Sequence, residues 1–178
     1  MATFFMSFLG TSDYQTTIYS YEGRNAAPSP YIQEAVSEFF YNELSQPGSM
    51  IRVFTTPSAS QRHWESSSGL FSRLRKNLPG TEITTSDIEP FDNELGLWRL
   101  FDALFESIPK KAELILDITH GYRTLPMLAM AVINYARTLK KIQVKAILYG
   151  AYEAEVEGKT PIIDMTRMDR LLRWGHAV

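Results

Sequence analysis

The chain has 178 residues, of which 44% are hydrophobic and 21% are charged, and it carries a formal net charge of -2 with a pI near 5.9. These values are typical of one globular domain with a real core, and they disfavour duplex nucleic acid as a partner, since a duplex requires a basic face. The chain has no cysteine, which excludes disulfides and thiolate-bound zinc, and its three histidines do not predict a multi-histidine metal site. We therefore expect a cytoplasmic protein with no metal and no other cofactor.

The N-terminal segment ATFFMSFLG predicts a buried strand over residues 3–9, which Gly10, Thr11 and Ser12 close. A signal peptide would need a basic region before its apolar run, and a longer run than this one. No segment approaches the roughly 20 apolar residues of a membrane-spanning helix. We therefore expect no association with a membrane.

Strand-like and helix-like patterns alternate along the rest of the chain. We predict extended segments or strands at residues 14–21, 50–56, 82–85, 112–118, 145–150 and 161–165. We predict helices at residues 30–45, 58–77, 92–108, 124–140 and 169–174. Ser29 is the predicted N-cap of the first helix, with Pro30 at its first position and a stop at Gln46. A run of serines before Gly69 weakens the middle of the second helix.

The segment at residues 112–118 is an almost continuous apolar run, which is typical of a parallel strand covered by helices on both sides. Together with the alternation, it predicts an α/β fold that is Rossmann-like, with a mainly parallel central sheet flanked by helices, in one domain over residues 1–178. In the helix at residues 124–140, we assign to the core the apolar residues at helical spacing, namely Leu125, Leu128, Val132, Tyr135 and Leu139. Met127 and Met130 are expected to fill gaps in that core.

A polar motif, DITHGYR, lies at the end of the buried strand. In open parallel sheets, ligands bind beyond the carboxyl ends of the strands, where this motif falls. Asp117 and Thr119 are two residues apart in an extended segment and so project to the same side, while His120 and Gly121 begin the loop into the next helix. The N–H groups at the start of that helix and the guanidinium of Arg123 favour an anion, so the motif predicts a phosphate-binding site.

Structural alternatives exist for the same side chains. Asp117 can cap the following helix or hold the loop instead of contacting a ligand. Arg123 can pair with Asp117, and His120 can be a hydrogen-bonded histidine of the fold. The loop at residues 10–12 supplies small and hydroxyl-bearing residues near the same edge of the sheet, but it matches no glycine fingerprint of dinucleotide or P-loop sites.

Four segments together resemble a known family, namely FLGTSDYQTTIYSY, LILDITHGYRTLPMLAMAVINYARTL, VKAILYGAYEA and PIIDMTRMDRLLRWGHAV. They are similar to the CRISPR-associated proteins named for a DxTHG motif, whose N-terminal part is a CARF (CRISPR-associated Rossmann fold) domain, and the DITHG sequence is the specific element. The segment PSASQRHW, at residues 57–64, follows the family only loosely. The resemblance implies a two-fold homodimer that binds a cyclic oligoadenylate across its interface, as the second messenger of type III CRISPR antiviral defence.

The leading function that the resemblance implies is a cyclic oligoadenylate sensor, with tetra-adenylate as the expected ring, that controls an effector. Family members usually carry a C-terminal effector domain, and we expect none within this chain, which ends at Val178. An alternative is a metal-independent ring nuclease, in which the ribose 2'-OH attacks the adjacent phosphorus and leaves linear products with 2',3'-cyclic phosphate ends. His120 and Arg123 would then be catalytic. A third alternative is a generic nucleotide-binding Rossmann domain.

The predicted ligand-binding residues come from the two loops and a neighbouring strand end, namely Gly10, Thr11, Ser12, Asp117, Thr119, His120, Gly121, Tyr122, Arg123 and Tyr149. The candidates for stacking on adenine are Tyr14, Tyr122 and Tyr149. A two-fold dimer would present each of these residues twice, to equivalent halves of a ring.

Overall fold

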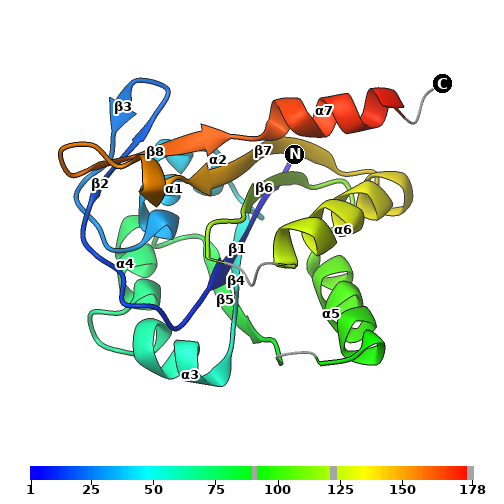
Figure 1. The fold of residues 1–178 in the computed structure, drawn as a ribbon, viewed down its shortest axis with the longest axis horizontal. Coiled ribbons are helices and arrows are strands. Elements are labelled where there is room, and N and C mark those ends of the chain that lie inside the picture. Colours follow the sequence, from blue (N-terminus) through cyan, green and yellow to red (C-terminus); the bar gives the residue numbers. More distant parts are fainter. Residues whose placement is uncertain (90–91, 121–123, 176–178) are drawn as a thin grey trace.

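The computed structural model describes residues 1–89, 92–120 and 124–175 (Figure 1). Its strands are β1 (Thr3–Leu9), β2 (Ile18–Tyr21), β3 (Arg24–Asn25), β4 (Met50–Thr55), β5 (Glu82–Asp87), β6 (Glu113–Asp117), β7 (Gln143–Gly150) and β8 (Lys159–Asp164). Its α-helices are α1 (Ile32–Phe39), α2 (Tyr41–Leu44), α3 (Pro57–Ala59), α4 (Leu70–Asn77), α5 (Glu94–Ser107), α6 (Leu125–Lys140) and α7 (Thr166–Gly175). A π-helical turn, η1 (Ser60–Trp64), follows α3, and a 3-10 turn, η2 (Tyr152–Ala154), follows β7.

The strands form one sheet in the order β3-β2-β8-β7-β6-β1-β4-β5. The five strands β7, β6, β1, β4 and β5 are parallel to one another, and β8 and β3 supply the antiparallel pairings. After β1 the chain first forms β2 and β3 at one edge of the sheet, then adds β4 and β5 outward from β1, and then returns to place β6 on the other side of β1. This order confirms the Rossmann-like α/β prediction, and it puts the point where strand order reverses between β1 and β6.

Helices cover both faces of the parallel strands, as the apolar run of β6 predicts. Alternate residues of β1 and β6 enter two separate cores, so that Phe5 and Ile115 face α1 and α4 while Phe4 and Leu114 face α5 and α6. Figure 1 shows α5 and α6 together on one side of these strands and α1 and α4 on the other. The central strands are therefore held rigidly from both sides, which suits them to position a site at their ends.

The first helix differs from the sequence prediction, because Ser29 is not its N-cap. Ser29 exchanges two backbone hydrogen bonds with Thr17, at 3.0 and 3.1 Å, and this extended pairing delays the helix until Ile32. The Ser29 hydroxyl instead donates to the carboxylate of Glu34 at 2.5 Å. The predicted helix at residues 58–77 is also divided, into α3, η1 and α4, at the serine-rich weak point.

The core assignment for α6 is right for only part of that helix. Leu125 and Val132 are buried, but Tyr135 and Leu139 are each 55% exposed, and Met127 is 79% exposed. The buried face instead runs through alanine and isoleucine positions, namely Ala129, Ile133 and Ala136. On the other face, Tyr135 keeps a contact with α5, because its ring packs edge-on against Phe101 and Phe105 with 5.7 Å between the ring centroids, while Met127 and Leu139 are left in solvent.

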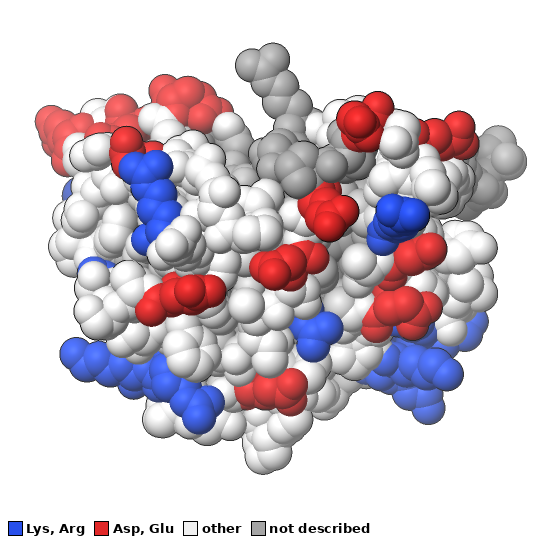
Figure 2. All heavy atoms as spheres, turned by 90° about the horizontal axis from the view of Figure 1, so that it is seen from below, with Lys and Arg blue, Asp and Glu red and all other residues white. Residues whose placement is uncertain are grey.

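The surface carries charges of both signs. Figure 2 views the molecule from the side on which α3 lies, and acidic and basic side chains are interspersed over the described part of that face. It therefore offers no continuous basic track of the kind that holds a duplex. Among the described helices, none has the length and apolar character needed to cross a membrane.

Candidate functional site

The loop at residues 10–12 and the described part of the DITHGYR motif, residues 117–120, meet at the carboxyl ends of β1 and β6. The strands are adjacent and parallel, with Met6 opposite Leu116, so the loop after Leu9 and the loop after Asp117 leave the sheet side by side. A Cβ added to Gly10 would lie 3.4 Å from the carbonyl oxygen of His120. The prediction that both motifs lie at one edge of the sheet therefore agrees with their placement at the point of strand-order reversal.

Asp117 anchors the second loop from inside the protein. Its carboxylate has no exposed surface, and it accepts hydrogen bonds from the Ser7 hydroxyl at 2.6 Å, the Thr119 N–H at 3.0 Å and the Thr119 hydroxyl at 2.5 Å. Burial raises the pKa of Asp117, and the hydrogen bonds from Ser7 and Thr119 act against that rise. In this conformation Asp117 has no direct access to a ligand. It holds the loop, which is the alternative role that the sequence analysis gave it.

The anchor extends through the sheet into α1 and β7. Gln33 of α1 donates to the Ser7 hydroxyl at 3.0 Å and to the Phe8 carbonyl at 2.9 Å. On the other side, the Thr119 hydroxyl accepts from the N–H of Gly150 at 2.8 Å. One buried polar network therefore fixes the ends of β1, β6 and β7 relative to one another.

A cavity of about 190 Å³ opens between the two loops. It is lined by Phe8, Leu9, Gly10, Thr11, Ser12, Phe54, Thr56, Ile88, His120 and Leu125. Thr11 and Ser12 are exposed, and in the described part of the chain the structure records no hydrogen bond from either backbone N–H. These N–H groups and hydroxyls are free to bind an anion.

A larger hollow of about 410 Å³ lies between the end of β5 and α5. Three of the residues that line it are acidic, namely Asp87, Glu89 and Asp92, against one cation, Arg99. This excess of negative charge disfavours an anionic ligand. The cavity between the two loops is therefore the better candidate for a phosphate.

His120 is packed between two tyrosine rings at the cavity wall. Its ring centroid lies 4.4 Å from that of Tyr14 and 5.7 Å from that of Tyr152. Its Nε2 is buried and has no hydrogen-bond partner among the described atoms. Burial, together with the nearby His63, lowers the pKa of His120 to about 4, so its imidazole is neutral at pH 7.

His63 of η1 is a member of this aromatic group that the sequence analysis did not find. Its ring lies 4.7 Å from Tyr14, on which His120 also packs. The Tyr14 hydroxyl accepts from the Gly10 N–H at 2.8 Å and closes the first loop. In the sequence, the segment PSASQRHW stood out only because it departs from the family pattern. No feature of that segment predicted the contact between His63 and Tyr14.

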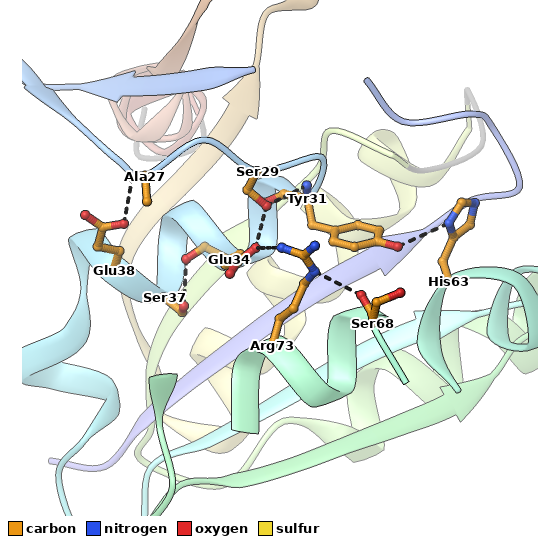
Figure 3. Close-up of polar contacts among 9 residues, drawn as sticks. All are labelled: Ala27, Ser29, Tyr31, Glu34, Ser37, Glu38, His63, Ser68 and Arg73. Carbon is orange, nitrogen blue, oxygen red and sulfur yellow. Dashed lines mark hydrogen bonds and ion pairs between the residues drawn. The ribbon is translucent and has the colours of Figure 1, made fainter. Parts of the chain in front are cut away.

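A second polar network holds His63 from behind (Figure 3). The hydroxyl of Tyr31 lies 3.4 Å from Nδ1 of His63. Arg73 of α4 pairs with Glu34 of α1 at 3.2 Å, donates to the Ser68 carbonyl at 2.9 Å and lies over the Tyr31 ring. The position of His63 therefore depends on the packing of α4 against α1.

The remaining predicted site residues fall into two groups. Tyr149 does not line the cavity, and its hydroxyl donates to the carboxylate of Glu153 at 2.9 Å. Gly121, Tyr122 and Arg123 lie outside the described residues, so their roles stay predictions.

Gly150 permits the close approach of Thr119, and its substitution tests the anchor. A Cβ at position 150 would lie 2.7 Å from Ile32 Cδ1 and 3.2 Å from Thr119 Cγ2. We expect Gly150→Ala to lower the free energy of unfolding by about 1–3 kcal/mol, as overpacking does. Urea unfolding measures this change, with Gly80→Ala as the control, because a Cβ at Gly80 meets nothing within 4 Å. Equal stability of the two variants would contradict the role given to Gly150.

The lowered pKa of His120 predicts a pH dependence of stability. Between about pH 6.5 and pH 4 the unfolded chain binds a proton at this residue that the folded chain does not, so stability falls as the pH is lowered. His120 alone accounts for at most about 3 kcal/mol of this loss. We expect His120→Gln to lose less stability than the wild type between pH 7 and pH 5, as measured by urea unfolding. His63 and Asp117 are present in both proteins, so the difference reports on His120 together with its interaction with His63. Equal losses would show that His120 is not buried and neutral.

Comparison with known proteins places this geometry in a family. Residues 4–153 match the family model described as the CARF domain of CRISPR system endoribonuclease Csx1. A CRISPR-associated protein of Methanocaldococcus jannaschii is 28% identical over 82 residues, which are 44% of this chain and 13% of the relative. The matched segment is thus a small part of that relative. Because the family match covers most of the chain and both loops of the site, the chain belongs to the CARF-domain family of CRISPR-associated proteins.

Proposed function

We propose that this chain is the sensor domain of a type III CRISPR system, that it binds a cyclic oligoadenylate and that it controls an effector. The single observation that carries the proposal is the cavity at the β1/β6 reversal point, where the loop at residues 10–12 meets His120 in a chain of this family. Tetra-adenylate is the ring that we expect.

The chemistry of the cavity suits a nucleotide with phosphates. Thr11 and Ser12 offer N–H and hydroxyl donors at its wall, and such donors bind phosphate oxygens well. The apolar part of the wall, which includes Phe8 and Phe54, suits the body of a base or a ribose. His120 lines the cavity and is neutral, and its buried Nε2 has no partner among the described atoms, so a turn of the ring would supply one hydrogen bond to a ligand.

A homodimer would complete the site. A cavity of about 190 Å³ is smaller than most small-ligand sites and far too small to enclose a ring of four nucleotides. One exposed apolar row follows α6 at intervals of four residues, through Met127, Ala131, Tyr135 and Leu139, and we call it the α6 stripe. Residues at this spacing share one helix face. We propose that two copies of the chain pack through the α6 stripe, which starts close to the His120 loop and so brings two half-sites together.

A ring nuclease is the second candidate function. It is favoured by one observation, a neutral imidazole in a residue that lines the cavity, His120, whose buried Nε2 has no hydrogen-bond partner among the described atoms. A turn of the ring toward the cavity would let this nitrogen accept the proton of a ribose 2'-OH. In that case the 2'-oxygen bonds to the adjacent phosphorus, the bond to the 5'-oxygen breaks, and the leaving oxygen takes up a proton. Arg123, whose role stays a prediction, would stabilise the developing charge.

Calorimetric titration with cyclic tri-, tetra- and hexa-adenylate tests the proposal. We expect the cyclic tetra-adenylate to bind with a stoichiometry of one ring per two chains, because each chain supplies half of the site. Chromatography of the mixture after incubation separates the two functions. An intact ring identifies a sensor, whereas linear products with cyclic phosphate ends that form in the presence of EDTA identify a ring nuclease.

The same titration on two variants tests the dimer. Leu139→Glu places a charge in the α6 stripe without removing the contact of Tyr135 with α5, and we expect it to be monomeric by light scattering and to bind the ring more weakly. Tyr41→Glu is the control, since Tyr41 is another exposed large apolar residue, on α2, away from the stripe. Failure of every ring to bind the wild type, or preferred binding of NAD or ATP, would contradict the proposed function.

A further inference from the structure

Arg62 lies beside the cavity and holds the loop that forms its wall. Its Nη1 donates to the carbonyl oxygen of Thr11 at 2.9 Å, and its Nη2 forms an ion pair with the carboxylate of Asp13. Thr11 itself lines the cavity. One guanidinium thus contacts the loop at a residue before and a residue after Ser12.

The backbone of Arg62 is firmly placed although its side chain is exposed. The next residue, His63, is buried and packs on Tyr14. The turn is also packed closely against Gly69, where an added Cβ would lie 2.7 Å from the Trp64 carbonyl oxygen and 2.8 Å from that of His63. Arg62 therefore projects from a fixed point, and π-helical turns of this kind are often found at functional sites.

The ion pair between Arg62 and Asp13 is easily exchanged. The side chains are 50% and 78% exposed, so water and salt screen their attraction. A phosphate that binds at Thr11 and Ser12 would compete with the Asp13 carboxylate for the same guanidinium. Arginine is suited to such an exchange, because one N–H group can stay on the Thr11 carbonyl while another turns to the phosphate.

The described lining of the cavity carries no positive charge. Among the described residues that line it, none is lysine or arginine. A ring with one phosphate per nucleotide brings several negative charges, which neutral donors balance only in part. Arg62 is anchored on the cavity wall through Thr11, so it can supply a cation there.

We propose that Arg62 is a ligand-binding residue, held at rest by Asp13, and that it exchanges the Asp13 carboxylate for a phosphate of the bound ring. This inference rests on the proposed function. It adds that the carboxylate of Asp13 opposes binding of the ring. Removal of Asp13 should strengthen binding, and it should do so only through Arg62.

A double-mutant cycle tests the exchange by calorimetric titration with cyclic tetra-adenylate. We expect Arg62→Ala to weaken binding about tenfold or more, since a hydrogen-bonded charge pair is lost. We expect Asp13→Asn to tighten binding about threefold, which is typical of releasing an exposed ion pair. In the double variant, the effect of Asp13→Asn should vanish, because no guanidinium is left to release.

Two control variants account for the general effect of charge. Lys110→Ala and Glu82→Gln change exposed charges just before β6 and at the start of β5, at the opposite edge of the sheet. We expect both to bind the ring as the wild type does. If Asp13→Asn binds no better than the wild type, or if its gain persists without Arg62, the exchange is wrong while the sensor function stands. If the wild type binds no ring, the proposed function fails and the exchange fails with it.

Discussion

Asp117 is a carboxylate without exposed surface at the end of β6, where hydrogen bonds from Ser7 and Thr119 replace its lost hydration. Burying a charge in this way is costly unless the partners are held in place. Two buried groups hold them, since Gln33 donates to Ser7 and the N–H of Gly150 donates to Thr119. The polar motif that interrupts the apolar chain is therefore satisfied inside the fold, and this sets where the His120 loop begins.

The anchor and the cavity divide the motif into two roles. Asp117 and Thr119 point inward and fix the loop, while His120 reaches the cavity wall beside the loop at residues 10–12. Both loops thus rest on strands that are packed on both faces. Thr11 and Ser12 in the proposed ligand site are more exposed, and the Arg62 pair beside them is readily broken. A rigid base with exchangeable contacts at its edge suits a protein that must respond to a ligand.

The fold and the placement of the two loops could be predicted because they follow from local patterns. Alternating apolar periods indicate strands and helices, and the continuous apolar run of β6 indicates a strand covered on both faces. The candidate site residues at positions 10–12 and 117–120 lie at or directly after the ends of such strands, so their proximity follows from the parallel topology.

Contacts that depend on packing between distant elements could not be predicted. His63 contacts Tyr14, and Arg62 contacts Thr11, across about fifty residues of sequence. Both come from a π-helical turn that no local sequence pattern predicts. The exposure of Tyr135 was missed for a related reason. Apolar residues occupy two faces of α6, and the periodicity alone does not say which face meets the sheet.

The most direct test of the central claim, that the β1/β6 edge is the ligand site, is a nuclear magnetic resonance titration of isotope-labelled protein with cyclic tetra-adenylate. The account predicts that the backbone amide signals of Thr11 and Ser12 and the ring signals of His120 shift together as the ring is added. Shifts confined to the acidic hollow between β5 and α5, with these three residues unchanged, would contradict it.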